Sequence, residues 1–283
     1  MKIGHLNHLL QSPKVFSLST RILELFQRHP YRLFSLEDIS DQTRVQPDKC
    51  SSALEHLIFF GLLERCDANR GVCYRADCSD QYWGDLDRFL RNSDDALHIS
   101  PTALVPGVFL DRDGVVNKVV MRNGRPFSPR TINEFEWTDG VKEYIERLKE
   151  HEFLIIVVTN QPDIAKGRLS RETLDAMTEL IYSHLPVDSV WICPHDDGDN
   201  CDCRKPKPGM LLEAAKRWGI DCSHSFVVGD SWKDMEAGRA AGCTSIILDR
   251  TYNQAVTCDH RLPNLKEAVR LILKVKKENT SDI

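Results

Sequence analysis

Two features are missing from this sequence of 283 residues, a positive net charge and a long hydrophobic run. The formal net charge is −5, so the chain has no overall positive field to hold nucleic acid or an anionic membrane surface. The first twenty residues lack the apolar run of a secretory signal. Nowhere do about 20 apolar residues follow one another, as a membrane-spanning helix requires. We therefore expect a cytoplasmic protein without a membrane partner, in which any anion site is local.

Cysteine, by contrast, is plentiful, with ten residues. In a reducing compartment, thiols serve as metal ligands or as small buried side chains more often than as disulfides. Four of them lie in the first third of the chain without the spacing of a common zinc module, at Cys50, Cys66, Cys73 and Cys78. For these four, both metal binding and simple burial stay open.

The first part of the chain, residues 1–98, predicts a small helical domain. Apolar residues recur at helical spacing in residues 16–29, Ser35 and Asp38 form a capping-box pattern, and a third helix begins near Pro47. Two short extended runs around an Asn-Arg-Gly turn follow this helix. Three helices followed by a hairpin are typical of a winged helix.

Charge argues against the DNA binding for which many winged helices are used. Residues 1–98 carry 12 basic and 14 acidic side chains, whereas DNA-binding domains usually present a basic face. We therefore expect no specific DNA binding from this domain. Self-association is another use that the fold allows.

From residue 107 onward, short and continuously apolar runs alternate with amphipathic helices. This pattern is typical of a parallel sheet that helices cover on both faces. We therefore expect a doubly wound α/β domain over residues 107–283, with residues 99–106 as a linker. Active sites in such sheets lie at the carboxyl ends of the strands, which here carry Asp111, Thr159, Cys193 and Asp230.

Two aspartates follow the first expected strand closely, in the run FLDRDGVVN. The carboxylates of Asp111 and Asp113 repel each other unless a cation or a shared proton intervenes. Such a pair is also found in an ordinary strand-to-helix turn. A catalytic role is favoured because further polar residues, Thr159, Lys205 and Asp230, end or follow later expected strands.

These residue types fit phosphoryl transfer. A carboxylate can attack phosphorus, Mg²⁺ and a lysine can neutralise the phosphoryl oxygens, and a second carboxylate can move the proton. We expect Asp111 to be the nucleophile and Asp113 the acid and base. Thr159 would bind the phosphoryl group, and Asp230 would complete a magnesium site with Asp111.

The run CPHDDGDNCDC offers four metal ligands within eleven residues, Cys193, His195, Cys201 and Cys203. Three thiolates and one imidazole suit tetrahedral Zn²⁺, and a site with all four positions filled should be structural. Arg204 and Lys205 follow directly. A bound zinc ion would therefore stiffen the loop that presents these two cations.

The ordered runs DRDGV, VVTNQ, RKPKP and VVGDSWKD resemble the four motifs of the haloacid dehalogenase superfamily. An aspartate two residues after the nucleophile is the pattern of the phosphatases in that superfamily. The stretch between Asp111 and Thr159 is interpreted as a turn plus a helix. The chain is therefore not expected to carry a large cap domain.

Within that superfamily, TNQPDIAKG and CPH…CDCRKPKPGM resemble the bacterial D-glycero-D-manno-heptose 1,7-bisphosphate 7-phosphatases. The resemblance implies Mg²⁺ held by Asp111, the backbone carbonyl of Asp113 and Asp230. It also implies a phosphorylated small-molecule substrate and contacts to it from Thr159, Asn160, Gln161, Arg204 and Lys205.

The sequence departs from the heptose enzymes at two places. Pro162 stands where they have a serine, and the loop between His195 and Cys201 is shorter. Histidinol-phosphate phosphatases share the short loop, so histidinol phosphate is an alternative substrate. A second alternative is a DNA-binding regulator with a phosphatase-like sensor domain, which the intact aspartates and Lys205 do not favour.

Overall fold

The computed structural model describes residues 13–59, 62–68, 71–76 and 104–281. The chain separates into two compact units, one within residues 1–100 and one within residues 101–283. Val105 forms a parallel bridge with Ile220. The second unit therefore extends into the segment that the sequence predicts as a linker.

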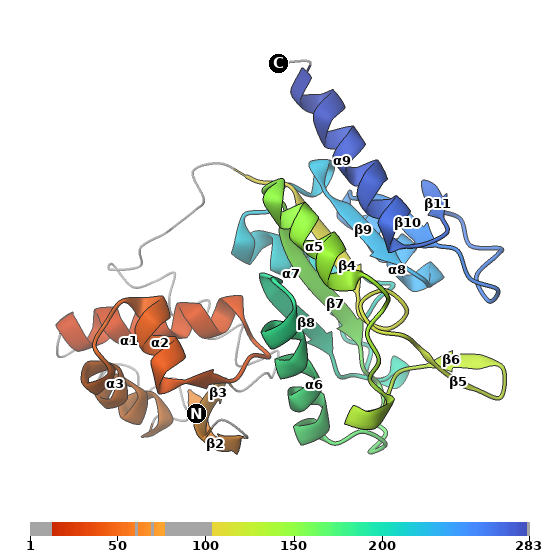
Figure 1. Ribbon diagram of the computed structural model, residues 1–283. Coiled ribbons are helices and arrows are strands. Elements are labelled where there is room, and N and C mark those ends of the chain that lie inside the picture. The colour runs from red at the N-terminus through yellow and green to blue at the C-terminus, as the bar shows by residue number, and fades with distance from the viewer. Residues whose placement is uncertain (1–12, 60–61, 69–70, 77–103, 282–283) are drawn as a thin grey trace. The chain divides into compact units, whose positions relative to one another are not determined.

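The first unit contains three helices and a small antiparallel sheet (Figure 1). Its elements are α1 (Pro13–Arg28), β1 (Phe34–Ser35), α2 (Leu36–Thr43), α3 (Pro47–Phe59), β2 (Leu63–Ala68) and β3 (Gly71–Ala76). The strands lie in the order β1-β3-β2. Ser35 and Asp38 form the capping box at the start of α2. The three helices and the hairpin agree with the sequence pattern, whereas β1 is additional and the winged-helix assignment stays a prediction.

Three of the four cysteines in the first third of the chain lie among the described residues of this unit. Cys50 is buried, with its thiol 3.5 Å from the hydroxyl of Thr43. Cys66 and Cys73 face each other across β2 and β3, and the Cys66 thiol donates to the Cys73 carbonyl at 3.6 Å. Within the described ranges these three do not gather into a group of three or more ligands. Cys78 lies outside the described residues.

The second unit is built on a six-stranded sheet in the order β11-β10-β9-β4-β7-β8, and all its paired neighbours are parallel. The strands are β4 (Gly107–Asp111), β7 (Leu154–Asn160), β8 (Ser189–Cys193), β9 (Phe226–Gly229), β10 (Thr244–Leu248) and β11 (His260–Leu262). Every residue of β4, β8 and β9 is buried. These continuous apolar runs therefore bury both of their faces, as the sequence predicts.

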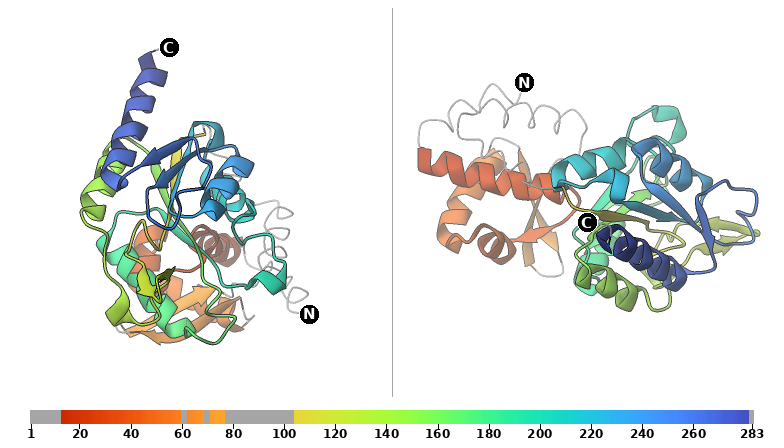
Figure 2. Two further views of the ribbon diagram at one scale, coloured as in Figure 1. Left: turned by 90° about the vertical axis from the view of Figure 1, so that its right-hand side faces the viewer. Right: turned by 90° about the horizontal axis from the view of Figure 1, so that it is seen from above.

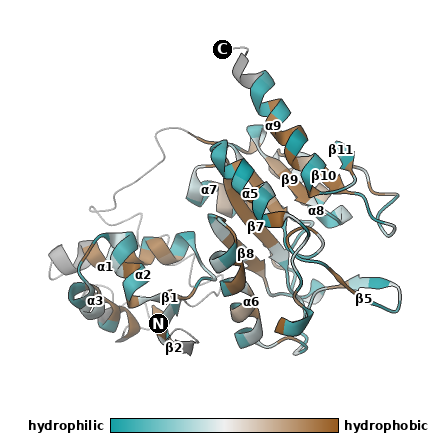
Figure 3. Cartoon of the chain, in the orientation of Figure 1, coloured by the Kyte–Doolittle hydropathy of each residue, from teal (hydrophilic) through white to brown (hydrophobic). Residues whose placement is uncertain are grey.

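Helices cover both faces of this sheet. They are α5 (Val141–Glu150), α6 (Arg171–His184), α7 (Gly209–Trp218), α8 (Trp232–Ala241) and α9 (Leu265–Ser281). Helices α5, α6 and α9 lie on one face and α7 and α8 on the other (Figures 1 and 2). The strands are the most hydrophobic layer (Figure 3). None of the helices in the described part of the chain is long and apolar enough to cross a bilayer.

The direction of winding reverses between β4 and β9. From β4 the chain moves outward through β7 to β8, and it then returns to β9 and continues through β10 to β11. The predicted doubly wound α/β fold is confirmed. Loops that leave neighbouring strands in opposite directions open a crevice at such a reversal, so the carboxyl ends of β4 and β9 are the natural place for a site.

A small hairpin stands where other folds of this kind insert a large cap. Between β4 and α5 the chain forms β5 (Val120–Arg122), β6 (Arg125–Phe127) and a 3₁₀ turn at Ile132–Glu134. Asn123 and Gly124 connect the two strands with φ values of 50° and 74°. The absence of a large cap is as predicted for this stretch, but the hairpin is an addition to the predicted turn and helix.

Candidate active site

Acidic side chains gather where β4 and β9 end. Asp111 is the last residue of β4, Asp230 follows β9, and Asp234 lies in the first turn of α8. A ligand oxygen of each lies within 4.8 Å of the others. Gly114 makes this approach geometrically feasible, because a Cβ on it would lie 2.0 Å from Oδ2 of Asp230.

Lys205 lies inside this acidic cluster. Its ammonium donates to Asp111 Oδ1 at 2.7 Å, to Asp234 Oδ1 at 2.6 Å and to the Val158 carbonyl at 2.8 Å. Burial by itself would lower the pKa of Lys205, but the two carboxylates outweigh it and hold the pKa above its usual value. The side chain is therefore a permanent cation beside Asp111.

The cluster carries more negative than positive charge. Two buried cations, Lys205 and Arg112, face the carboxylates of Asp111, Asp113, Asp230 and Asp234. Burial and the neighbouring Asp234 raise the pKa of Asp111 well above its usual range. The same two causes raise the pKa of Asp230 to about 7. Hard divalent cations prefer carboxylate oxygen as a ligand. The carboxylates of Asp111, Asp230 and Asp234 therefore fit Mg²⁺.

Asp113 has a different environment, which favours its charged form. Arg112 donates to both of its oxygens at 3.1 Å, and Asn117 donates to Oδ1 at 3.0 Å. Ser128 and Gln161 each donate to Oδ2 at 2.8 Å. Burial by itself would raise the pKa of Asp113. Arg112 and these hydrogen-bond donors lower the pKa by more than burial raises it, so the net shift is downward. The resting side chain is a carboxylate.

Thr159, Asn160 and Gln161, the predicted substrate-contacting residues at the end of β7, have different hydrogen-bond partners. Thr159 accepts from the Gln161 side-chain amide at 2.9 Å, and Gln161 itself is fully buried. Asn160 exchanges two hydrogen bonds with the backbone of Lys205, at 2.9 Å and 3.1 Å. Asn160 therefore ties the loop of Lys205 to the sheet, and Gln161 ties Thr159 to Asp113.

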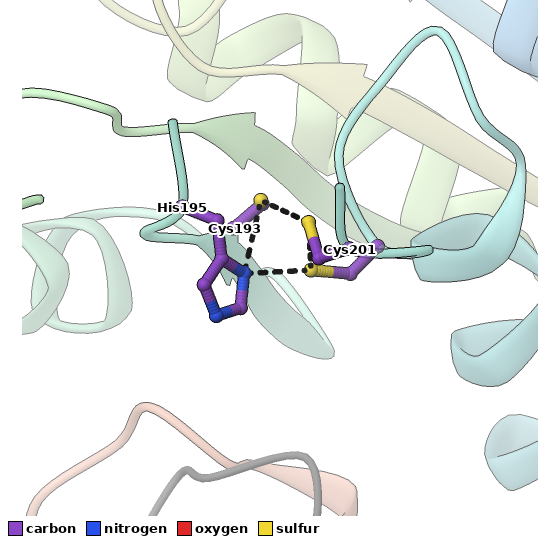
Figure 4. Close-up of side chains that lie close together, drawn as sticks. Cys193, His195 and Cys201 are labelled. Atoms are coloured by element: carbon purple, nitrogen blue, oxygen red, sulfur yellow. Dashed lines mark hydrogen bonds between the residues drawn. The ribbon is translucent and has the colours of Figure 1, made fainter. Parts of the chain in front are cut away.

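Cys193, His195 and Cys201 converge at the end of β8 (Figure 4), and Cys203 contacts both His195 and Cys201. The Cys193 thiol lies 3.7 Å from that of Cys201 and 3.6 Å from Nδ1 of His195, and Cys203 lies 3.5 Å and 3.3 Å from the same two partners. Ligands at about 2.0–2.3 Å from one tetrahedral zinc ion are about 3.3–3.8 Å apart. The donor set therefore has the spacing of a zinc site.

One thiol of this group is already acidic. Hydrogen bonding from Cys203 lowers the pKa of Cys193 to about 5, and its interactions with His195 act in the same direction. Cys201 and Cys203 have raised pKa values, Cys201 chiefly through burial and Cys203 chiefly through Cys193. One thiolate beside two thiols is the state that a metal ion would convert to three thiolates.

Ion pairs connect the metal-ligand loop to its surroundings. Arg204 donates to Asp197 at 2.7 Å and to the His195 carbonyl at 3.2 Å. Lys166 pairs with Asp196 at 2.8 Å. The predicted substrate-contacting Arg204 is thus anchored by the loop that precedes it.

A hollow of about 440 Å³ opens over these groups, a volume within the usual range for small-molecule sites. Its lining includes most of the predicted residues, namely Asp111, Asp113, Thr159, Asn160, Arg204, Lys205 and Asp230. It also includes Asp234, the last residue of the run VVGDSWKD, and residues that sequence reasoning missed, namely Phe127, Ser128, Trp232, Lys233 and Tyr252. Gln161, which was predicted to contact the substrate, is not among the lining residues, but its side chain donates to two of them, Asp113 and Thr159.

The fold and this acidic site with its embedded lysine define a hydrolase of the phosphoryl-transfer type, and comparison with known proteins gives the family. A family model for haloacid dehalogenase-like hydrolases matches residues 105–242. The chain belongs to this family, and it is a phosphoric monoester hydrolase. The predicted superfamily and enzyme class are confirmed.

Two curated relatives carry the same name, D-glycero-beta-D-manno-heptose-1,7-bisphosphate 7-phosphatase. The protein from Yersinia pestis is 39% identical over 162 residues, which are 53% of this chain and 83% of that protein. The protein from Escherichia coli K12 is 38% identical over 159 residues, covering 52% and 80%. Both matches leave nearly half of this chain without a counterpart.

A solved structure supports the same relationship. The D,D-heptose 1,7-bisphosphate phosphatase from B. bronchiseptica, in complex with magnesium and phosphate, superposes with a TM-score of 0.53 and 27% identity. The similarity covers 60% of this chain and 99% of that protein. The α/β unit is therefore the part that the two proteins share.

Proposed function

We propose that this protein is a Mg²⁺-dependent phosphatase that forms a phospho-aspartate on Asp111 and removes the 7-phosphate of D-glycero-D-manno-heptose 1,7-bisphosphate. One observation supports phosphoryl transfer most strongly. The ammonium of Lys205 lies between the carboxylates of Asp111 and Asp234, in a cluster where acidic side chains outnumber basic ones. The names of the relatives from Yersinia pestis and Escherichia coli support the substrate. The runs IAKG and KPGM favour it too.

Asp111 and Asp230 would hold the magnesium ion, together with the backbone carbonyl of Asp113. The ion, when bound, supplies positive charge for the phosphoryl oxygens. Asp234 takes a supporting part, because it accepts from Lys205 at 2.6 Å and from the Ser231 amide at 3.1 Å. Lys205 is thereby fixed where it can bind a phosphoryl oxygen and keep Asp111 in place.

In the first step, a carboxylate oxygen of Asp111 attacks phosphorus and the bond from phosphorus to the sugar oxygen breaks. Asp113 gives its proton to that leaving oxygen. The resting Asp113 is charged, so it must first take up a proton. The arrival of an anionic phosphate beside it raises its pKa and favours this uptake.

In the second step, Asp113 takes a proton from a water molecule that attacks the same phosphorus atom. The bond between phosphorus and Asp111 breaks, inorganic phosphate is released, and the carboxylate of Asp111 is restored. Thr159 and Lys205 bind the phosphoryl oxygens throughout, and they line the hollow beside Asp111.

We further propose that Cys193, His195, Cys201 and Cys203 bind one structural zinc ion. The purified protein is expected to contain about one zinc per chain, and the double change C201S and C203S should reduce this to near zero. Activity should fall with the zinc, because Arg204 is anchored to the same loop. Elemental analysis and phosphatase assays measure both effects.

The half-buried Cys258 lies outside this group, so C258S is the matched control and should retain zinc and activity. Zinc that persists in the double variant would place the metal elsewhere in the chain.

Substrate preference tests the choice of sugar. The value of kcat/KM for heptose 1,7-bisphosphate is expected to exceed that for histidinol phosphate by at least about tenfold, or about 1.4 kcal/mol in transition-state binding. Steady-state assays with purified protein and Mg²⁺ measure the ratio. A reversed ratio would make the short loop between His195 and Cys201 the better guide to specificity.

The proposed chemistry does not involve the first unit, because every residue with a proposed role in catalysis or metal binding lies between Asp111 and Asp234. The exposed side chains described on α3 include Asp48, Lys49 and Glu55, which supports the prediction that specific DNA binding is not its use. Self-association through this unit stays a prediction.

A further inference from the structure

The segment between β10 and β11 returns over the carboxyl ends of β4 and β9 and donates three hydrogen bonds there, one to Gly114 after β4 and two to Asp230 after β9. Arg250 Nη2 donates to the Gly114 carbonyl at 3.0 Å. The Tyr252 hydroxyl donates to Oδ2 of Asp230. The Asn253 side chain donates to the backbone carbonyl of Asp230 at 2.8 Å. The segment therefore clamps both the backbone and the carboxylate of Asp230.

Hydrogen bonds of Asn253 hold this segment in place. Asn253 is buried and also donates to the Leu248 carbonyl at 2.8 Å. Its side-chain oxygen accepts from the Arg250 amide at 3.0 Å and from Arg261 Nη1 at 3.1 Å. Arg261 lies in β11, so the strand at the sheet edge fixes the segment. Tyr252 is consequently presented to Asp230 by a rigid backbone.

Asp230 has little freedom between its neighbours. The backbone of Gly114 comes so close to Oδ2 of Asp230 that no side chain would fit there. The Tyr252 hydroxyl donates to the same oxygen. The carboxylate is buried. Oδ2 is thus fixed by the hydrogen bond from Tyr252 and by close packing against Gly114, and rotation of the carboxylate would break that hydrogen bond.

We propose that Tyr252 is a positioning residue for the divalent cation, acting through Asp230. This inference rests on the proposed Mg²⁺-dependent function. Donors that hold a metal ligand in one orientation typically contribute tenfold to a hundredfold to metal affinity. Tyr252 lines the hollow, and its hydroxyl is the atom that contacts the Asp230 carboxylate. Its removal should therefore affect the cation before it affects the sugar.

The test is the variant Y252F, which removes only the hydroxyl. Titration calorimetry with Mg²⁺ on the full chain, without substrate, should give a dissociation constant about tenfold higher than that of the wild type. At low Mg²⁺ the variant should be slow, and excess Mg²⁺ should restore most of kcat with little change in KM for the sugar phosphate. A role confined to folding would not produce this recovery.

The control is Y144F, because Tyr144 lies in α5 and lines a different hollow. It should bind Mg²⁺ as the wild type does. The Y252F protein should also melt close to the wild-type temperature. Unchanged Mg²⁺ affinity in a folded Y252F protein would overturn the role of Tyr252 while leaving the proposed function intact. A wild-type protein that neither binds nor needs Mg²⁺ would overturn the proposed function itself.

Discussion

The variant D111N is expected to lose at least about 10⁴-fold in kcat, as removal of a nucleophile typically does. An amide has nearly the size of a carboxylate but cannot supply the attacking oxygen. The fold should persist, because Lys205 keeps its hydrogen bonds to Asp234 and to the Val158 carbonyl. Steady-state kinetics and thermal melting together separate loss of chemistry from loss of structure.

The matched control for this variant is D139N, since Asp139 is almost fully exposed and pairs with Lys118 at 3.3 Å. It removes the same charge from the same unit and should leave activity unchanged. Activity of D111N within about tenfold of the wild type would refute the assignment of the nucleophile.

The variant D113N is expected to respond differently to different leaving groups. With a sugar phosphate it should lose about 10²–10⁴-fold, because the leaving alkoxide needs a proton. With p-nitrophenyl phosphate the leaving group is stable without one, so Asp111 should still be phosphorylated. The second step needs the base and should be slow, which predicts a burst of nitrophenol close to one per active site. Stopped-flow absorbance measures the burst.

Stability should also fall in D113N. Arg112 is buried and pairs with Asp113, and breaking a buried ion pair costs about 3–5 kcal/mol. The assays therefore belong at a temperature well below the melting point of the variant. Equal losses with both substrates, and no burst, would show that Asp113 does not exchange protons with the leaving group and the water.

The sequence predicts the sheet of the second unit well because its strands are continuously apolar. A short run such as SVWIC is by itself enough to indicate a strand that is buried on both faces. The hairpin β5–β6 had a local signal that was overlooked. Asn-Gly is the preferred pair for a tight hairpin turn in which both residues have positive φ, as Asn123 and Gly124 do.

Other contacts had no local signal. Tyr252 meets Asp230 only because β10 and β9 are neighbours and the following segment turns back over them. Ser128 reaches Asp113 only because the chain returns, after the β5–β6 hairpin, to the loop that follows β4. The nucleophile and its neighbours stand at strand ends and could be placed from the fold, whereas such supporting residues depend on loop conformation.

The central claim is the covalent intermediate on Asp111, and chemical trapping tests it most directly. D113N protein mixed with p-nitrophenyl phosphate and Mg²⁺, then denatured and treated with borohydride, should yield homoserine at position 111. Borohydride reduces an acyl phosphate but leaves a free carboxylate, and mass spectrometry of the peptide that contains residue 111 detects the change. Homoserine at that position, absent without substrate and in D111N, is the predicted result. An unmodified Asp111 in protein that has released its nitrophenol would contradict the account.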